Sequence, residues 1–148
     1  MKIQVYVVSH SEEDIQDLIV YLNETRSYFK ECLAMTQKHV DKGIIQSDYA
    51  IDAIIDQCNR FLDAKENEII KVVSKRIDAF EPLSYDKKQA YKKQVRDAVN
   101  TSVIPAYQDV VKYFTALKGT QKNNGALCNW NDGKKYYEIL LRYHTPLT

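Results

Sequence analysis

The chain is poor in the residues that interrupt regular structure. Its 148 residues include only four glycines and three prolines. An all-β fold needs a turn about every 8–12 residues, so this scarcity argues against one. No apolar run approaches the roughly 18–20 residues of a membrane span, and we expect none. Residues 1–8 also lack the apolar core and cleavage site of a secretion signal.

An excess of charge of one sign is also missing. The chain has 21 basic and 20 acidic residues, a net charge of +1. A dedicated nucleic-acid binder usually has a marked basic excess, so we do not expect nucleic acid as a partner. The best candidates for phosphate contacts are Lys88, Lys92 and Arg96, at steps of four and accompanied by Lys87 and Lys93. Asp86 and Asp97 interrupt this stripe, which is more typical of a solvated helix face.

The sequence has no local pattern for catalysis or metal binding. Its histidines (His10, His39, His144) and cysteines (Cys32, Cys58, Cys128) are widely spaced, with no His-Glu-x-x-His and no Cys-x-x-Cys. There is also no Gly-x-Ser-x-Gly nucleophile turn. We therefore expect no catalytic residue and no metal ligand here. Cys32 and Cys58 fall on apolar helical faces and are expected to be buried thiols, although the state of all three cysteines stays open.

Apolar residues recur at helical spacing along almost the whole chain. Ser11, Ser47 and Ser84 are expected to cap helices at their N-termini, Thr25 is expected to cap a further one, and Gly43 to end one. Glu12, Glu13 and Asp14 suit the positive first turn of the first helix better than a cation site. Before it, Ile3, Val5 and Val7 alternate with polar residues as in a short extended segment. The predicted inward stripes include Ile15, Leu18, Ile19 and Leu22; Ile51, Ile54, Ile55 and Cys58; and Ile69, Ile70, Val73 and Ile77.

The longest helical pattern runs from about residue 84 to residue 118, and Pro105 lies near its middle. Proline cannot donate the hydrogen bond to the carbonyl of Thr101, so a kink or a break is expected there. A Gly- and Asn-rich loop over residues 119–131 precedes a last helix that starts after Asp132. The sequence predicts an all-α bundle of five to seven helices, with residues 1–148 forming one domain.

Aromatic residues gather near the C-terminus. Trp130, Tyr136, Tyr137 and Tyr143 lie there, among 11 tyrosines in the chain. Such side chains bury large areas while keeping a polar end, which suits a core boundary, a domain interface or the wall of a pocket. If they form a substrate wall, the expected residues are Trp130, Tyr136, Tyr137 and Arg142, with the guanidinium pairing with a carboxylate.

Four groups of residues, in this order and at these distances, resemble the bacterial domain-of-unknown-function 885 family. They are residues 22–25 with Tyr28-Phe29; residues 43–48 with 53–58; residues 103–107; and residues 125–130 with 132–137, 140–142 and Thr145. Members of that family are long, largely helical proteins that resemble zinc-dependent peptidases, with a metal motif of the His-Glu-x-x-Pro-Gly-His-His type on a later helix. Many carry secretion or lipoprotein signals.

The resemblance implies that the chain is one piece of a larger protein, and that this piece ends before the zinc motif. Residues 146–148 depart from the family pattern, which continues with a Gly and a new helix start. The chain alone is then expected to be inactive, serving as scaffold and part of a substrate wall. Its partners would be the rest of the parent chain, or a second copy through bare apolar faces. The alternative is a stand-alone helical bundle that acts as a protein-interaction module.

Overall fold

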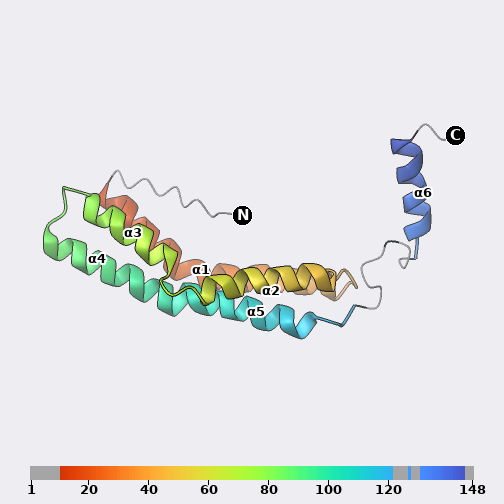
Figure 1. Ribbon diagram of the computed structural model, residues 1–148, viewed down its shortest axis with the longest axis horizontal. Coiled ribbons are helices and arrows are strands. Elements are labelled where there is room, and N and C mark those ends of the chain that lie inside the picture. The colour runs from red at the N-terminus through yellow and green to blue at the C-terminus, as the bar shows by residue number, and fades with distance from the viewer. Residues whose placement is uncertain (1–10, 122–126, 128–130, 146–148) are drawn as a thin grey trace.

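The computed structural model describes residues 11–121, 127 and 131–145 (Figure 1). All regular structure in this part of the chain is helical. The helices are α1 (Glu12–Val40), α2 (Asp48–Leu62), α3 (Glu68–Ala79), α4 (Tyr85–Ala98), the π-helical segment η1 (Val99–Val103), α5 (Ile104–Leu117) and α6 (Gly133–His144). The all-α prediction is confirmed. The extended segment predicted around Ile3, Val5 and Val7 lies outside the described residues.

Three of the predicted helix starts are confirmed by their caps. The Ser11 hydroxyl accepts from the backbone N–H of Asp14 over 3.1 Å, and Asp14 Oδ2 accepts from the backbone N–H of Ser11 over 2.9 Å. Ser47 and Ser84 accept backbone N–H groups in the same way at the starts of α2 and α4. Each such cap typically stabilises a helix by about 1 kcal/mol. α3 begins at Glu68, where the side chain of Asn67 accepts the backbone N–H groups of Ile69 and Ile70.

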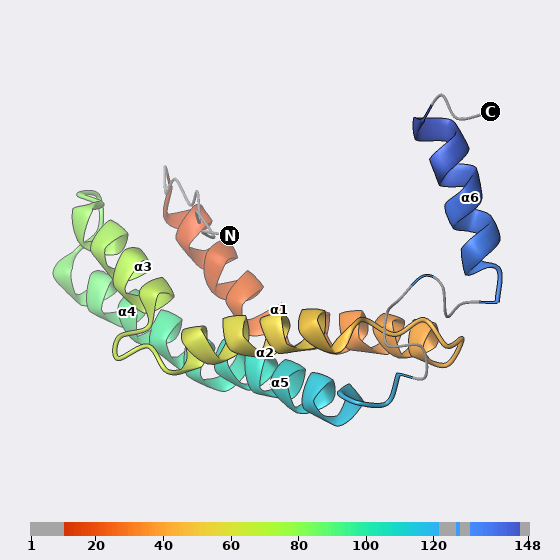
Figure 2. The same ribbon diagram turned by 45° about the vertical axis from the view of Figure 1, so that its right-hand side comes forward.

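The prediction of a second cap at Thr25 was wrong. The helix α1 runs without interruption past Thr25, whose hydroxyl donates to the carbonyl oxygen of Tyr21 over 3.0 Å. Figure 2 shows that α1 nevertheless changes direction along its length. Close to Thr25, the backbone N–H of Arg26 donates to the hydroxyl of Ser102 over 3.1 Å. A foreign side chain inserted into a helical ladder is a recognised cause of bending, so the helix bends here and does not end.

The long helix predicted over residues 84–118 is present as α4, η1 and α5 joined end to end. At 1.5 Å per residue this rod is about 50 Å long. The predicted irregularity at Pro105 takes the form of the π-helical turn that precedes it. The backbone N–H of Ile104 reaches back to the carbonyl oxygen of Val99, a step of five residues. This wider turn accommodates a proline that cannot donate to Thr101.

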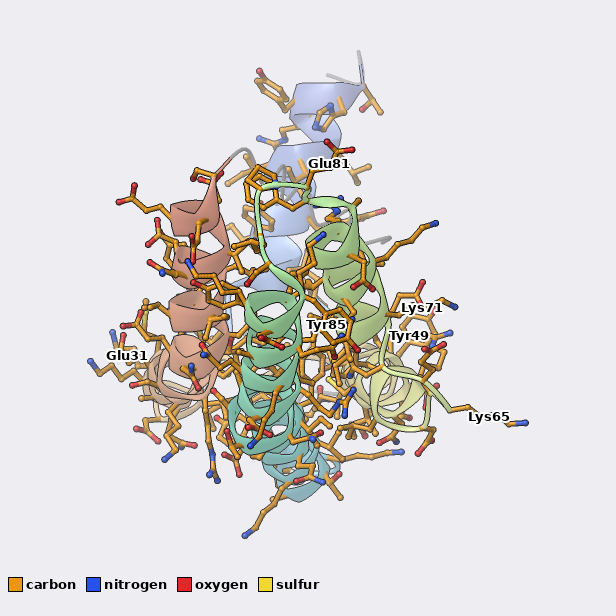
Figure 3. The ribbon with its side chains drawn as sticks, turned by 90° about the vertical axis from the view of Figure 1, so that its left-hand side faces the viewer. Glu31, Tyr49, Lys65, Lys71, Glu81 and Tyr85 are labelled. Carbon is orange, nitrogen blue, oxygen red and sulfur yellow. The ribbon has the colours of Figure 1, made fainter. Side chains whose placement is uncertain are left out.

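The rod is the axis around which the bundle is organised. α1 follows it along its length and contacts α4, η1 and α5. α3 packs beside α4, and α2 packs beside α5, so the two short helices follow one another along the rod (Figures 1 and 2). Viewed from the α3–α4 end, α4 lies between α1 on one side and α3 on the other (Figure 3). Each half of the bundle is therefore a three-helix arrangement that shares α1 and the rod.

Two clusters of buried side chains fill these halves. The larger one joins α1, α3, α4 and η1 and contains Ile15, Ile19, Leu22, Val73, Ile77, Leu83, Tyr91, Val95, Ala98, Val99 and Val103. The smaller one joins α2 and α5 through Ile51, Phe114 and Leu117, with Leu33 and Val40 of α1 packed against it. Burying one such aliphatic or aromatic side chain contributes about 1.5–3 kcal/mol. The predicted stripes thus supply both clusters.

The two described cysteines differ in burial. Cys58 is buried and Cys32 is exposed, and both are free thiols. The prediction that Cys32 is buried was wrong, because the inward side of α1 in this half is formed by Leu33 and Val40 and Cys32 lies at its edge. Cys128 lies outside the described residues.

Candidate functional site

The last helix carries the described residues of the predicted substrate wall. Tyr136 and Tyr137 are 53% and 55% exposed, and Arg142 is also exposed. At about 100° per residue, Arg142 lies roughly 140° around α6 from Tyr137 and about 120° from Tyr136. The two tyrosines and the guanidinium therefore do not share one face of the helix. Trp130 lies outside the described residues.

A hollow lies at the start of α6, where this helix meets the turn between α1 and α2. Its volume is about 560 Å³, and Tyr136 is the aromatic side chain in its lining. The other lining residues are Lys42, Gly43, Leu127, Asn131, Asp132 and Gly133. Gly43 has a φ of +79°, a backbone conformation that glycine adopts without strain. Of the predicted wall, the structure brings Tyr136 to a concave surface.

Beyond this hollow, α6 extends away from the other helices in both views of the ribbon (Figures 1 and 2). Its apolar side chains are largely exposed: Ile139 by 56%, Leu141 by 41% and Tyr143 by 84%. The polar groups Lys134, Lys135, Glu138 and Arg142 lie mainly on the opposite side of the helix. An amphipathic helix with an uncovered apolar side is typical of a surface that contacts another polypeptide.

A second concave surface lies between α3 and α4, and we call it the basic groove. Its volume is about 610 Å³, and its lining residues are Glu66, Ile70, Lys71, Ser74, Lys75, Asp78, Gln89, Lys92, Lys93 and Arg96. The sequence indicated only its α4 side, the stripe that includes Lys92 and Arg96. Lys71 and Lys75 of α3 were missed because a charge pair one turn apart on a helix looks like an ordinary solvated face.

Part of the basic groove is fixed by one ion pair and one hydrogen bond between the two helices. Lys92 Nζ lies 2.7 Å from Asp78 Oδ1, and the Lys92 side chain is only 18% exposed. Lys88 Nζ donates to the carbonyl oxygen of Asp78 over 2.9 Å. Lys71 Nζ lies 3.4 Å from Glu66 Oε2 near the other end of α3. The predicted solvated stripe is thus partly a seam between α3 and α4.

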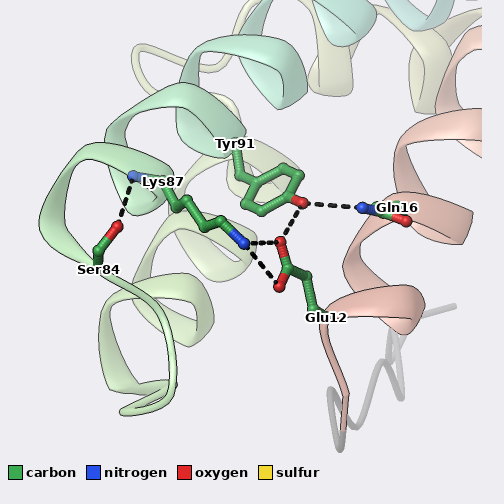
Figure 4. A network of polar contacts seen from close by, with 5 residues as sticks. All are labelled: Glu12, Gln16, Ser84, Lys87 and Tyr91. Carbon is green, nitrogen blue, oxygen red and sulfur yellow. Dashed lines mark hydrogen bonds and ion pairs between the residues drawn. The ribbon is translucent and has the colours of Figure 1, made fainter.

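A polar network ties the first turn of α1 to the start of α4 (Figure 4). Glu12 Oε1 accepts from the Tyr91 hydroxyl over 2.7 Å and from Lys87 Nζ over 2.9 Å. Gln16 Nε2 donates to the Tyr91 oxygen over 2.9 Å. The hydrogen bonds from Tyr91 and Lys87 hold the pKa of Glu12 below its usual value, and Glu12 raises the pKa of Lys87. The acidic first turn of α1, which was predicted to complement the helix dipole, therefore also links α1 to α4.

The described residues contain no group of three or more His, Cys, Asp and Glu side chains that could hold a metal ion. The zinc that the resemblance implies therefore has no site among them. Burial raises the pKa of the Cys58 thiol, which keeps it protonated at neutral pH and makes it a poor nucleophile. In the same part of the chain, no helix is long and apolar enough to cross a bilayer.

Comparison with known protein families gives a match over residues 6–148 to the family described as bacterial protein of unknown function (DUF885). The chain belongs to this family. Neither the curated proteins nor the solved structures gave a match. The family match confirms the resemblance carried by the four groups of residues, all of which fall within the matched range.

Three of the four DUF885 groups meet in the middle of the bundle, around Tyr107 of α5. Its ring lies 5.4 Å from that of Phe29 and 4.2 Å from that of Phe61, measured between centroids. Burial raises the pKa of Tyr107, and the nearby Cys58 adds to this shift. Phe29, Cys58 and Tyr107 come from three different groups of the resemblance. Tyr107 and Phe61 pack against the larger core cluster, so these motifs have a packing role beside it, and the described residues of the fourth group lie in α6 and around its ends.

Proposed function

We propose that this DUF885 chain is a non-catalytic helical portion of a zinc-dependent peptidase-like protein. In this proposal the bundle is a scaffold, and α6 provides a surface that packs on further polypeptide and forms part of a substrate wall. The observation that carries it is the exposed apolar side of α6, whose Tyr136 also lines the hollow next to Gly43. Soluble domains rarely leave a continuous apolar surface uncovered.

The rigidity of the bundle supports the scaffold role. Two buried clusters run through it, and side-chain bonds join α1 to the rod at both ends. Lys87 pairs with Glu12 at one end, and the Tyr113 hydroxyl donates to Gln37 at the other over 3.0 Å. Between them, Arg26 Nε lies 3.1 Å from Asp109 Oδ2. These contacts join α1 to the rod along the whole length of the bundle.

The proposed wall uses the tyrosines and Arg142 in different ways. Tyr136 and Tyr137 offer ring faces with hydroxyl ends, which suit the side chain of a bound peptide. Arg142 lies on another side of α6, so it would pair with a carboxylate of the surrounding protein or at the rim of the site. The described residues provide no zinc ligands, so no chemical step is assigned to this chain.

A hydrolysis assay on the purified chain tests the proposal that this chain is non-catalytic. We expect no cleavage of a mixed peptide library, with or without added zinc. Turnover that scales with protein concentration and survives repeated purification would refute the proposal. A chain in which His39 and His144 are both replaced by alanine is the control, because contaminating peptidase activity would be unchanged in it.

The stand-alone interaction module is the alternative, and the same exposed side of α6 favours it. The two functions differ in what lies downstream in the gene. A reading frame that continues beyond codon 148 into a His-Glu-x-x-Pro-Gly-His-His type motif supports the scaffold function. A stop codon directly after codon 148 in the natural gene favours the interaction module.

A further inference from the structure

The basic groove concentrates positive charge that the chain as a whole does not have. Its lining includes five cationic side chains against two carboxylates, a net charge of +3, whereas the whole chain carries +1. Clusters of one sign in a concave surface focus the electrostatic potential and attract ligands of the opposite sign. The lining also offers the hydroxyl of Ser74 and the amide of Gln89 as neutral donors.

The two carboxylates lie at the ends of the groove. Glu66 precedes α3, and Asp78 is near its last residue. Because α3 and α4 form a hairpin in which Asp78 lies beside Lys92, residues 71–75 lie beside the stretch that ends at Arg96. The cations Lys75, Lys93 and Arg96 therefore lie between the two ends of the groove, and Lys71 lies toward Glu66. Figure 3 shows Lys71 on the opposite side of the molecule from Glu31 of α1.

The ion pairs leave a set of cations available in that middle part. Lys92 is held by Asp78, and Lys71 lies only loosely against Glu66 at 3.4 Å with 56% of its side chain exposed. Lys75, Lys93 and Arg96 are exposed and form no ion pair within the described part of the chain. The structure thus provides three to four cationic groups around one concave surface.

We propose that the basic groove binds a compact phosphate-bearing anion, a function beyond the scaffold role of the bundle. Lysine ammonium groups and the planar fork of arginine are the side chains that recognise phosphate oxygens. A long polyanion such as a nucleic acid fits less well, because Glu66 and Asp78 would repel its backbone at both ends of the groove. A small ligand with dense charge meets only the cationic middle.

The test uses inorganic pyrophosphate as the probe and ¹H–¹⁵N NMR of the purified chain at low ionic strength. We expect saturable shifts confined to the amides of residues 66–78 and 89–96. The double variant Lys93→Glu with Arg96→Glu should weaken binding by about tenfold or more, since it reverses two charges near the ligand. Lys112→Glu, an exposed lysine on α5, is the matched control and should bind within about twofold of the wild type.

Binding experiments with other phosphate compounds distinguish a small anion from a nucleic acid or a lipid surface. Binding of a phosphate monoester with the same footprint supports the proposal. Tighter binding of an oligonucleotide or of anionic lipid vesicles, with shifts outside the groove, would overturn it. Absence of saturable shifts, or equal weakening by Lys112→Glu, would also overturn it. If the double variant fails to fold, Lys93→Gln with Arg96→Gln replaces it, with a smaller loss of affinity expected.

Discussion

The hydroxyl of Ser102 donates to the carbonyl oxygen of Asn23 over 2.8 Å. The same hydroxyl oxygen accepts the backbone N–H of Arg26 over 3.1 Å. One side chain of the π-helical segment therefore bonds to two backbone groups of α1, 79 and 76 positions away in the sequence. Ser102 is only 5% exposed, so these bonds form in a site that water reaches poorly. Ser102 thus connects the bend of α1 to the π-helical turn before Pro105.

Replacing Ser102 by alanine should lower the free energy of unfolding. The change leaves two partly buried backbone groups of α1 without this partner, which costs about 1–3 kcal/mol. Thr101→Ala is the matched control: Thr101 is exposed and its hydroxyl bonds only to Asp97 of its own helix, so we expect a loss below about 0.5 kcal/mol. Urea unfolding of both variants measures the difference. Equal stability of the two variants would show that Ser102 does not hold the bend.

The turn after α5 depends on Gly119, which has a φ of +76° and donates its N–H to Asp48 Oδ1 over 3.0 Å. No atom lies within 4 Å of a Cβ placed there, so any penalty comes from the backbone alone. Gly119→Ala should lower the free energy of unfolding by about 1–2 kcal/mol. Gly119→Asn should lower it less, because asparagine adopts this conformation more readily. Thermal unfolding of both variants checks the order, and a more stable alanine variant would refute it.

The pKa of Glu12 lies below its usual value of 4.5, so its bonds to Tyr91 and Lys87 add stability above that pH. As the pH falls, the unfolded chain takes up this proton first, and the contribution is lost once the pH passes below the folded-state pKa. The gap in stability between the wild type and Glu12→Gln should therefore be constant near neutral pH and shrink below 4.5. Urea unfolding as a function of pH measures this gap. Glu13→Gln, at the exposed neighbouring position, is the control, and a gap that shrinks no more for Glu12→Gln than for Glu13→Gln would contradict this role of Glu12.

Most helices and both cores could be predicted from the sequence because their determinants are local. Serine caps and a period of 3.6 residues placed Ile15, Ile51 and Ile77 correctly in the interior. Thr25 was misread as a helix start because the bend near it depends on Ser102, whose approach no local pattern reveals. Cys32 was misplaced because it lies beside Leu33 at the edge of the inward side of α1, where the helical period does not decide burial.

The candidate surfaces were less accessible to sequence reasoning. The basic groove needs Lys71 and Lys75 from α3 beside Lys93 and Arg96 from α4, and only the pairing of the two helices brings them together. The tyrosines of α6 were recognised as a group, but their spacing from Arg142 places the guanidinium on another side. That residues 1–148 form one domain stays a prediction.

Sedimentation of the purified chain over a wide range of concentrations tests most directly whether the exposed side of α6 is a contact surface. Left uncovered, it should cause reversible self-association that increases with concentration. Tyr137→Ser with Leu141→Ser should abolish this association, whereas Lys134→Ser with Lys135→Ser, on the polar side of α6, should not. A wild-type chain that stays monomeric at high concentration would contradict a contact role for α6, as would equal association of both double variants.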